Sequence, residues 1–417
     1  MQFRFIFVTA ALLAVSGAQG QQVPGNGWDD YKKAEAIMND GLLNVYADPI
    51  GGASATPWVT DPLRTQIAEM SMQLKTKDYL AQQYAAVRRY SAALESVLAG
   101  NQKAMVAQTD TQSLHDVLPV SYHAAKLFAA KAYCQASEGD IPGAIQSLLA
   151  GLVVTDRMNG YTVVGNLFGD LADTVTFERF SELLPSLSLR DLSTVRSFVS
   201  RQLAGSEQMD RMIRTYQTLT EGHIAAITAS SAGANDNLAE ISRALAEQLS
   251  TAGAQDMQTL AADLRQASQS QFDQMIQAVH RPETEWWEAT SGWPQSTAAP
   301  EIPDHATMDQ VSQALLPTLI LGLHRIVVVE LTRRTEFRLL GLNAALVEYR
   351  WHNHRLPAQL SDFVTDQDGF DPLANQPFVY KPEQDGTYRI YSQGRPDTGV
   401  VELKYAGRPS VPKPGSP

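Results

Sequence analysis

The stretch Ala124–Leu152, AAKLFAAKAYCQASEGDIPGAIQSLLAGL, decides the fold class of this 417-residue chain. In each half of it, apolar residues recur three and four positions apart, which is the spacing of one face of an α-helix. The first set is Ala124, Leu127, Phe128 and Ala132, and the second is Ile141, Ala144, Ile145, Leu148, Leu149 and Leu152. The stretch therefore predicts two amphipathic helices in succession.

The residues between the two stripes predict a tight turn. Gly139 suits the left-handed position that follows the end of a helix, and the carboxylate of Asp140 can cap the next one. Pro142 falls in the first turn of the second helix, where its missing N–H is not needed. We therefore expect an antiparallel helical hairpin.

The second half of this hairpin resembles a tetratricopeptide-type repeat, through the pattern Gly139-Asp140-x-x-x-Ala144-Ile145-x-x-Leu148-x-x-Gly151-Leu152. The resemblance covers roughly 35 residues, and Lys131 and Gln135 depart from it where the repeat usually has apolar or aromatic side chains. One such unit is found, whereas a solenoid needs about three. The resemblance implies helical hairpins that stack side by side.

The N-terminus predicts export. Arg4 precedes an apolar run from Phe5 to Val15, which is too short to span a bilayer and has the length of a signal-peptide core. Small residues at Ser16, Ala18 and Gly20 provide the cleavage positions. We expect residues 1–20 to be a signal peptide and the mature chain to be periplasmic or extracellular.

Composition excludes some classes of partner. The net charge of −12 disfavours nucleic acid and anionic lipid. The later apolar stretch from Leu315 to Val329 is interrupted by His324 and Arg325, so it predicts a buried helix and no stable membrane span after signal removal. Cys134 is the single cysteine, so an intramolecular disulfide is ruled out. We expect Cys134 to pack on a helix as a small apolar side chain.

The helical signal continues beyond the hairpin. We expect a helical-hairpin domain at 21–205, with a helix from Thr162 to Leu184 and a capping box at Ser188 and Asp191 that opens another. A long antiparallel helical hairpin is expected at 206–280. Its first predicted stripe is Leu238, Ile241, Leu245 and Leu249, and its second is Met257, Leu260, Leu264, Ala267, Phe272, Met275, Ile276 and Val279.

Residues 281–306 have the composition of a loop, with Pro282, Gly292, Pro294, Pro300 and Pro303. This loop also carries Trp286, Trp287 and Trp293, which are the candidate binding residues of the chain. Two interpretations remain open: the aromatics either pin the loop to the body of the protein or are displayed for a ligand. Pinning is the favoured one, because an exposed aromatic loop invites aggregation.

Residues 307–406 predict a small α+β module. A helix is expected from about Met308 to His352, with a kink at Pro317 and a charged patch formed by Arg333, Arg334, Glu336 and Arg338. Leu356-Pro357 ends it, because the residue before proline is pushed out of helical geometry. Strands are expected at 377–380, 388–391 and 400–405, with a turn at Asp385-Gly386. The module is a long helix on a two- to three-stranded antiparallel sheet, and residues 407–417 are a disordered tail.

The ordered motifs of this module resemble the globular head of type II secretion pseudopilins. They are Tyr349, Leu356-Pro357-Ala358-Gln359-Leu360, Asp371-Pro372 with Pro377-Phe378-Val379-Tyr380, and Asp385-Gly386-Thr387-Tyr388-Arg389-Ile390-Tyr391-Ser392-Gln393-Gly394. The resemblance implies the fold of the head. The anchoring apolar helix of that family does not precede the module, and the calcium loop of some members is reduced to Asp397, so neither a filament nor calcium binding is implied.

Motifs for catalysis or metal binding are missing from the sequence. It has no Gly-x-Ser-x-Gly, no His-Glu-x-x-His and no Gly-x-x-x-x-Gly-Lys. His352 and His354 do not share a helix face and have no acidic or cysteine partner at ligand spacing, and His115 and His123 are separated by Pro119. We predict no enzyme, no cofactor and no metal site.

The sequence thus favours a mainly α, exported, non-catalytic binding or scaffolding protein that acts through protein–protein contacts on helical hairpins. Its partner would be another protein or an envelope polymer. The alternative is a component of a secretion or pilus-like machine that docks through the C-terminal head. An enzyme whose site is assembled only by the fold is a third hypothesis.

Overall fold

The computed structural model describes residues 23–38, 77–105, 117, 119–158, 163–204, 207–228, 254–290, 307–383, 387–395 and 399–402. They are mostly helical, with small antiparallel sheets near the C-terminus, which confirms the predicted fold class. The predicted signal peptide, the predicted tail, the stripe at 238–249, His115, Trp293 and Asp397 lie outside the described residues.

The chain divides into two compact units. Unit 1 comprises Met1–Asn159, Val164–Gly205 and Leu331–Pro417, and unit 2 comprises Gly160–Val163 and Ser206–Glu330. The sequence analysis separates the helical-hairpin domain from the C-terminal module, whereas the structure places both in unit 1. Both aromatic contacts and hydrogen bonds join residues of the two parts that are far apart in the chain, and periodicity does not reveal such contacts.

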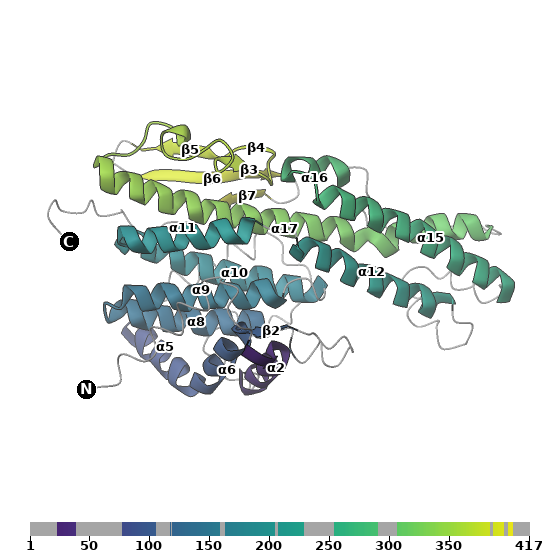
Figure 1. Ribbon diagram of the computed structural model, residues 1–417, viewed down its shortest axis with the longest axis horizontal. Coiled ribbons are helices and arrows are strands. Elements are labelled where there is room, and N and C mark those ends of the chain that lie inside the picture. Colours follow the sequence, from purple (N-terminus) through teal and green to yellow (C-terminus); the bar gives the residue numbers. More distant parts are fainter. Residues whose placement is uncertain are drawn as a thin grey trace. The chain divides into compact units, whose positions relative to one another are not determined.

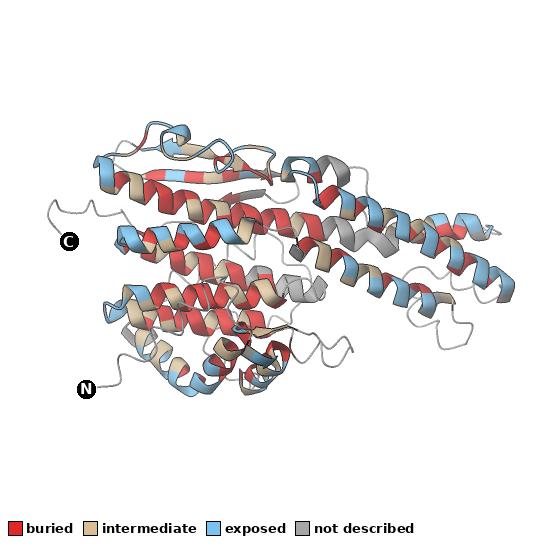
Figure 2. Ribbon diagram, in the orientation of Figure 1, coloured by how far each residue is buried: buried red, intermediate tan, exposed pale blue. Residues whose placement is uncertain are grey.

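The N-terminal part of unit 1 is a stack of helices around α8 and α9 (Figure 1). Its elements are β1 (Val23–Asn26), α2 (Gly27–Met38), α5 (Lys77–Arg89), α6 (Ser91–Asn101), β2 (Lys103–Ala104), α8 (Val120–Ser137), α9 (Ile141–Met158), α10 (Val163–Leu183), the 3-10 turn η1 (Leu184–Ser186) and α11 (Leu189–Leu203). The faces of α8 and α9 that meet their neighbours are buried (Figure 2). β1 pairs in parallel with β2.

The hairpin predicted from 124–152 is confirmed as α8 and α9. Gly139 has a φ of +83°, and the Gly143 N–H donates to Oδ1 of Asp140 at 3.1 Å, so the turn and the cap are the predicted ones. The predicted stripe of α9 is buried except at Ile141, which is partly exposed. A Cβ on Gly151 would lie 3.6 Å from the Cβ of Phe128, an ordinary van der Waals distance, so the two helices approach closely here and an alanine would still fit.

The capping box at the start of α11 is also confirmed. The Asp191 N–H donates to the Ser188 hydroxyl at 3.3 Å, and the Ser188 N–H donates to the Asp191 carboxylate at 3.1 Å. On the predicted buried face, Leu192, Val195 and Val199 are buried and Leu203 is partly exposed. The cap aligns α11 so that this face packs into unit 1.

The C-terminal part of unit 1 is a helix with a sheet beside it, as predicted (Figure 1). The helix is the portion of α17 (Met308–Asn353) from Leu331 onward. The short elements η2 (Leu360–Asp362), β3 (Phe370–Asp371) and β4 (Gln376–Pro377) follow it. A three-stranded antiparallel sheet then has the order β5 (Val379–Pro382), β6 (Tyr388–Arg395) and β7 (Gly399–Glu402).

Alternation along β6 orients this sheet. Tyr388, Ile390 and Ser392 are buried, whereas Arg389 and Gln393 are exposed. α17 ends as expected before Leu356-Pro357, and His354 takes the left-handed conformation at its end, with a φ of +53°.

Unit 2 contains a long antiparallel pair, α12 (Glu207–Thr228) and α15 (Ala254–Val279). The pairs in contact show that the two segments are antiparallel, because rising residue numbers on the first meet falling numbers on the second. They are Asp210 with His280, Tyr216 with Phe272, and Gln217 with Gln269. The predicted second stripe is on α15, where Met257, Leu260, Leu264, Phe272, Met275 and Val279 are buried. Among the described helices, α15 pairs with α12, a segment in which no apolar stripe is predicted from the sequence.

The predicted loop at 281–306 requires a correction, because residues Glu283–Thr290 form the helix α16. Pro282 stands just before its start, and Glu283 and Glu285 occupy its first turn, where carboxylates interact favourably with the helix dipole. Proline content misleads here, since proline is favoured at the start of a helix as well as in loops. Pro317, at the predicted kink, lies inside the helix α17.

Candidate functional site

The segment Thr332–Phe337 of α17 is buried although three of its residues are charged. The sequence analysis treats Arg333, Arg334, Glu336 and Arg338 as a charged patch beside an apolar face. This is wrong for the first three, whose side chains lie in the interior of unit 1. Burial of a charge is costly unless it is paired, so the partners of these residues decide what the segment does.

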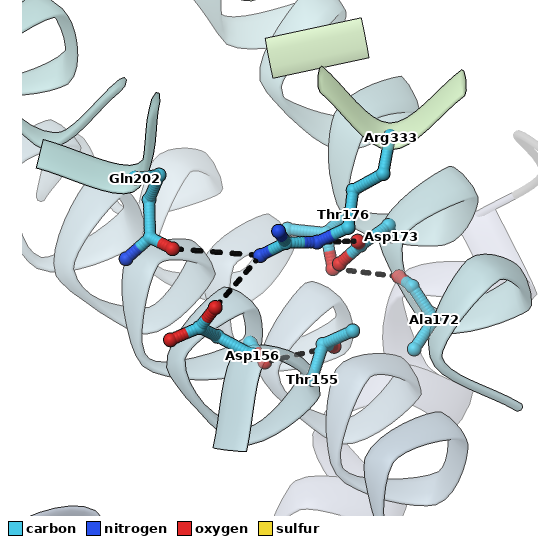
Figure 3. A network of polar contacts seen from close by, with 8 residues as sticks. Thr155, Asp156, Ala172, Asp173, Thr176, Gln202 and Arg333 are labelled. Carbon is cyan, nitrogen blue, oxygen red and sulfur yellow. Dashed lines mark hydrogen bonds and ion pairs between the residues drawn. The ribbon is translucent and has the colours of Figure 1, made fainter. Parts of the chain in front are cut away.

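Arg333 is the centre of the polar cluster (Figure 3). Its Nε donates to Oδ2 of Asp173 on α10 at 3.2 Å, and its Nη2 donates to Oδ1 of Asp156 on α9 at 3.0 Å. Nη2 also lies 3.4 Å from Oε1 of Gln202 on α11. The side chains of Arg333 and Asp173 are 4% and 1% exposed, whereas that of Asp156 is 35% exposed. One guanidinium thus joins four helices, with solvent reaching the cluster at Asp156.

Aromatic rings complete the surroundings of this guanidinium. Its Cζ lies 4.7 Å from the centroid of the Phe337 ring, a cation–π distance. Phe337 meets Phe177 edge to face, with 5.0 Å between their centroids. Arg333 is therefore fixed by hydrogen bonds in its plane and by a ring on its face.

The neighbouring side chains of α17 contact other parts of unit 1. Nη1 of Arg334 donates to the carbonyl of Leu203 at 3.2 Å, and the Thr335 hydroxyl donates to Oδ1 of Asp371 at 3.2 Å. Arg338 donates to the carbonyl of Phe370 at 3.2 Å. Together with Arg333, these side chains connect α17 with α9, α10 and α11 and with β3.

Asp371 is the buried carboxylate at the sheet end of these contacts. Burial raises the pKa of Asp371, and hydrogen bonds to the side chain of Ser392, the backbone of Ala374 and Leu373, and the side chain of Thr335 act in the opposite direction. The Leu373 N–H donates to it at 3.0 Å. The carboxylate therefore organises the turn after β3 as well as receiving a bond from α17.

Sequence patterns could not reveal the Arg333 cluster. Its acceptors precede Arg333 by 131, 160 and 177 positions and lie on three separate helices. The sequence nevertheless held one indication that these charged side chains are buried. Leu331–Leu340 reads LTRRTEFRLL, and its surroundings are so apolar that charged side chains must find partners inside the fold.

A second buried polar pair lies at the other side of the stack. Nδ1 of His123 on α8 is 2.8 Å from Oε1 and 3.1 Å from Oε2 of Glu35 on α2. Glu35 is 1% and His123 6% exposed. Burial raises the pKa of Glu35, and the hydrogen bond and charge of His123 oppose this rise. From the sequence, His123 was considered only together with His115, a joint site that Pro119 argues against, so this glutamate was missed.

The structure describes one of the three candidate tryptophan side chains. Trp286 is 2% exposed in unit 2, and its indole N–H donates to the carbonyl of Arg281 at 2.9 Å. For Trp286 this matches the interpretation in which the aromatic pins its segment. Trp287 lies on α16 and its side chain is not described, and Trp293 is outside the described residues.

The remaining candidates of the sequence analysis do not come together. Burial, followed by the charge of Glu138, raises the pKa of Cys134 to about 11, so its thiol stays protonated at neutral pH. His352 and His354 are exposed. Within the described ranges, no group of three or more His, Cys, Asp and Glu residues is arranged to hold a metal ion.

The part of the chain that the structure describes contains no helix long and apolar enough to cross a membrane. No family model matches the chain, and neither a curated protein nor a solved structure shows significant similarity to it.

Proposed function

We propose that this chain is an exported, non-catalytic binding or scaffolding protein, whose helical hairpins present a polar surface to another protein or to an envelope polymer. The observation that carries the proposal is the Arg333 cluster. In it Arg333 forms ion pairs with both Asp173 and Asp156. The guanidinium joins residues of four helices, which supports a role in holding the helical body together as a scaffold.

The character of the described surface supports a polar partner. Leu189, at 40%, is the single large apolar side chain that is clearly exposed among the described residues. The solvent face of α15 is instead formed by polar residues, among them Gln258, Arg265, Gln266, Gln269, Asp273 and Gln274. Contacts on such a surface would be hydrogen bonds and charge pairs, which give specificity without an aggregation risk.

Site-specific photo-crosslinking in the exporting cell tests this proposal. A photoreactive residue at Gln266 or Gln274, both exposed on α15, is expected to give a specific adduct. The same residue at Leu264, which is buried on the same helix, is the matched control and should give none. If exposed positions on α15, α11 and β6 all fail to give a specific adduct, the binding function is wrong.

A second candidate function is docking to an envelope machine through the C-terminal module. Its support is the outward face of the sheet, where Nζ of Lys381 and Cζ of Arg389 lie 5.6 and 5.0 Å from the centroid of the Tyr391 ring. Deleting the module would remove Asp371 from Thr335, so point substitutions are the better test. If Lys381→Glu with Arg389→Glu leaves the set of secreted proteins unchanged, this candidate is excluded.

A further inference from the structure

α2 is attached to the rest of unit 1 through a layer of apolar side chains and one buried titratable pair. Trp28, Tyr31, Ala34 and Met38 are all buried and form its inner face. Glu35 lies on the same face and meets His123 of α8. A buried glutamate in an otherwise apolar helix face is costly when ionised, so the protonation of this pair affects how firmly α2 is held.

The other charged groups on α2 and on the elements near it have contacts of their own or are at least partly exposed. Asp30 pairs with Lys103 at 2.6 Å, and Arg157 donates to the carbonyls of Gly100 and Lys103. Nζ of Lys126 lies 4.0 Å from the centroid of the Tyr122 ring. Lys33 of α2 and Glu95 of α6 are exposed, and Lys32 of α2 is partly exposed. His123 is the charged group that acts on the Glu35 carboxylate.

We propose that the Glu35–His123 pair is a proton-dependent latch, which holds α2 against α8 when Glu35 carries a proton and loosens as the pH rises. The proposal does not depend on the proposed binding function. In the protonated state the carboxyl group hydrogen-bonds to the imidazole without a buried negative charge. Loss of that proton leaves a carboxylate buried on the apolar inner face of α2, which is costly.

The direction of the pH dependence follows from linkage. Because burial raises the pKa of Glu35 above its ordinary value of 4.5, the closed state binds this proton more tightly than the open state. The extra stability is fully present below pH 4.5 and is lost as the pH rises through the raised pKa. Within that window, the equilibrium constant for opening α2 should increase by up to about tenfold per pH unit.

Hydrogen exchange of the α2 amides from pH 4 to 8, corrected for the intrinsic exchange rates, measures this constant on the full chain. Glu35→Gln imitates the protonated carboxyl, so its opening constant should not rise with pH. His123→Gln removes the cation that opposes the pKa rise, so opening should increase over a wider range of pH. The double variant Glu35→Gln, His123→Gln keeps two neutral amides and should show a flat profile.

A matched control comes from unit 2, where Asp210 and His280 form a pair at 3.2 Å whose side chains are 27% and 52% exposed. Asp210→Asn should leave the pH profile of α2 unchanged. Acrylamide quenching of Trp28, obtained as the difference between the protein and its Trp28→Phe variant, gives a second readout of opening. The proposal is overturned if Glu35→Gln and the unmodified protein show the same pH slope in α2.

Discussion

The α8–α9 hairpin and the Arg333 cluster both hold helices together in unit 1, but by opposite means. The hairpin joins neighbours in the sequence through apolar and small side chains, with Gly139 forming the turn and Gly151 the close approach. The cluster joins α17 to helices that precede it by 131 to 177 residues, through charged hydrogen bonds. The first is a local solution to burying surface, and the second requires the whole fold.

The two solutions differ in how they fail. Apolar packing loses stability in proportion to the atoms removed, because its neighbours can partly relax into the space. A buried ion pair fails abruptly, because removing one partner leaves the other as an uncompensated charge in the interior.

The largest effect is expected from Arg333→Ala. It leaves the carboxylate of Asp173, which is 1% exposed, without its cation, and the cost is about 3–5 kcal/mol of unfolding free energy. Urea denaturation followed by circular dichroism measures it. Adding Asp173→Asn removes the stranded charge, so the double variant should be more stable than Arg333→Ala alone. Equal or lower stability of the double variant would show that charge pairing is not what the cluster contributes.

Leu148→Ala tests the hairpin in the same assay. Leu148 is fully buried in the stripe of α9, and truncation leaves a cavity that costs about 3 kcal/mol. Leu189→Ala, at the exposed start of α11, is the matched truncation and should cost far less. Similar losses for the two leucines would contradict the packing described for α9.

Gly139→Ala measures what the left-handed backbone conformation of the turn costs a residue that has a Cβ. No atom lies within 4 Å of where the new Cβ would be, so the expected loss of about 1 kcal/mol arises only from the φ of +83°. Gly222→Ala on α12 also meets open space but has no positive φ, and it should be neutral or slightly stabilising. Thermal denaturation checks this: the melting temperature should fall for Gly139→Ala and should stay the same or rise slightly for Gly222→Ala.

The smallest effect is expected where a charge pair is exposed. Arg196 of α11 pairs with Glu348 of α17 at 2.5 Å, and its side chain is 46% exposed. Arg196→Ala should cost about 1 kcal/mol or less, since solvent screens the pair and salt weakens it. A loss comparable to that of Arg333→Ala, measured by the same denaturation, would remove burial as the reason for the contrast.

Local signals accounted for much of the fold. The 3.6-residue spacing placed α8, α9, α11, α15 and α17, and short-range chemistry placed the caps at Asp140 and Ser188. Alternation placed the sheet of β5, β6 and β7, whereas the predicted turn at Asp385-Gly386 lies outside the described residues. The same signals failed at α16, where a proline at a helix start was taken for loop composition.

Local sequence signals could not predict the two buried polar sites. The sequence placed Arg333 on a helix and His123 on a hairpin, but gave no reason to join Arg333 to Asp173 or His123 to Glu35. Helix periodicity and capping depend on residues within a few positions of one another, and so the sequence by itself determined the elements. Which buried charges meet depends on how helices distant in the sequence pack. Only the tertiary structure decided this, because the charged side chains come together only when the apolar faces of their helices pack and exclude water.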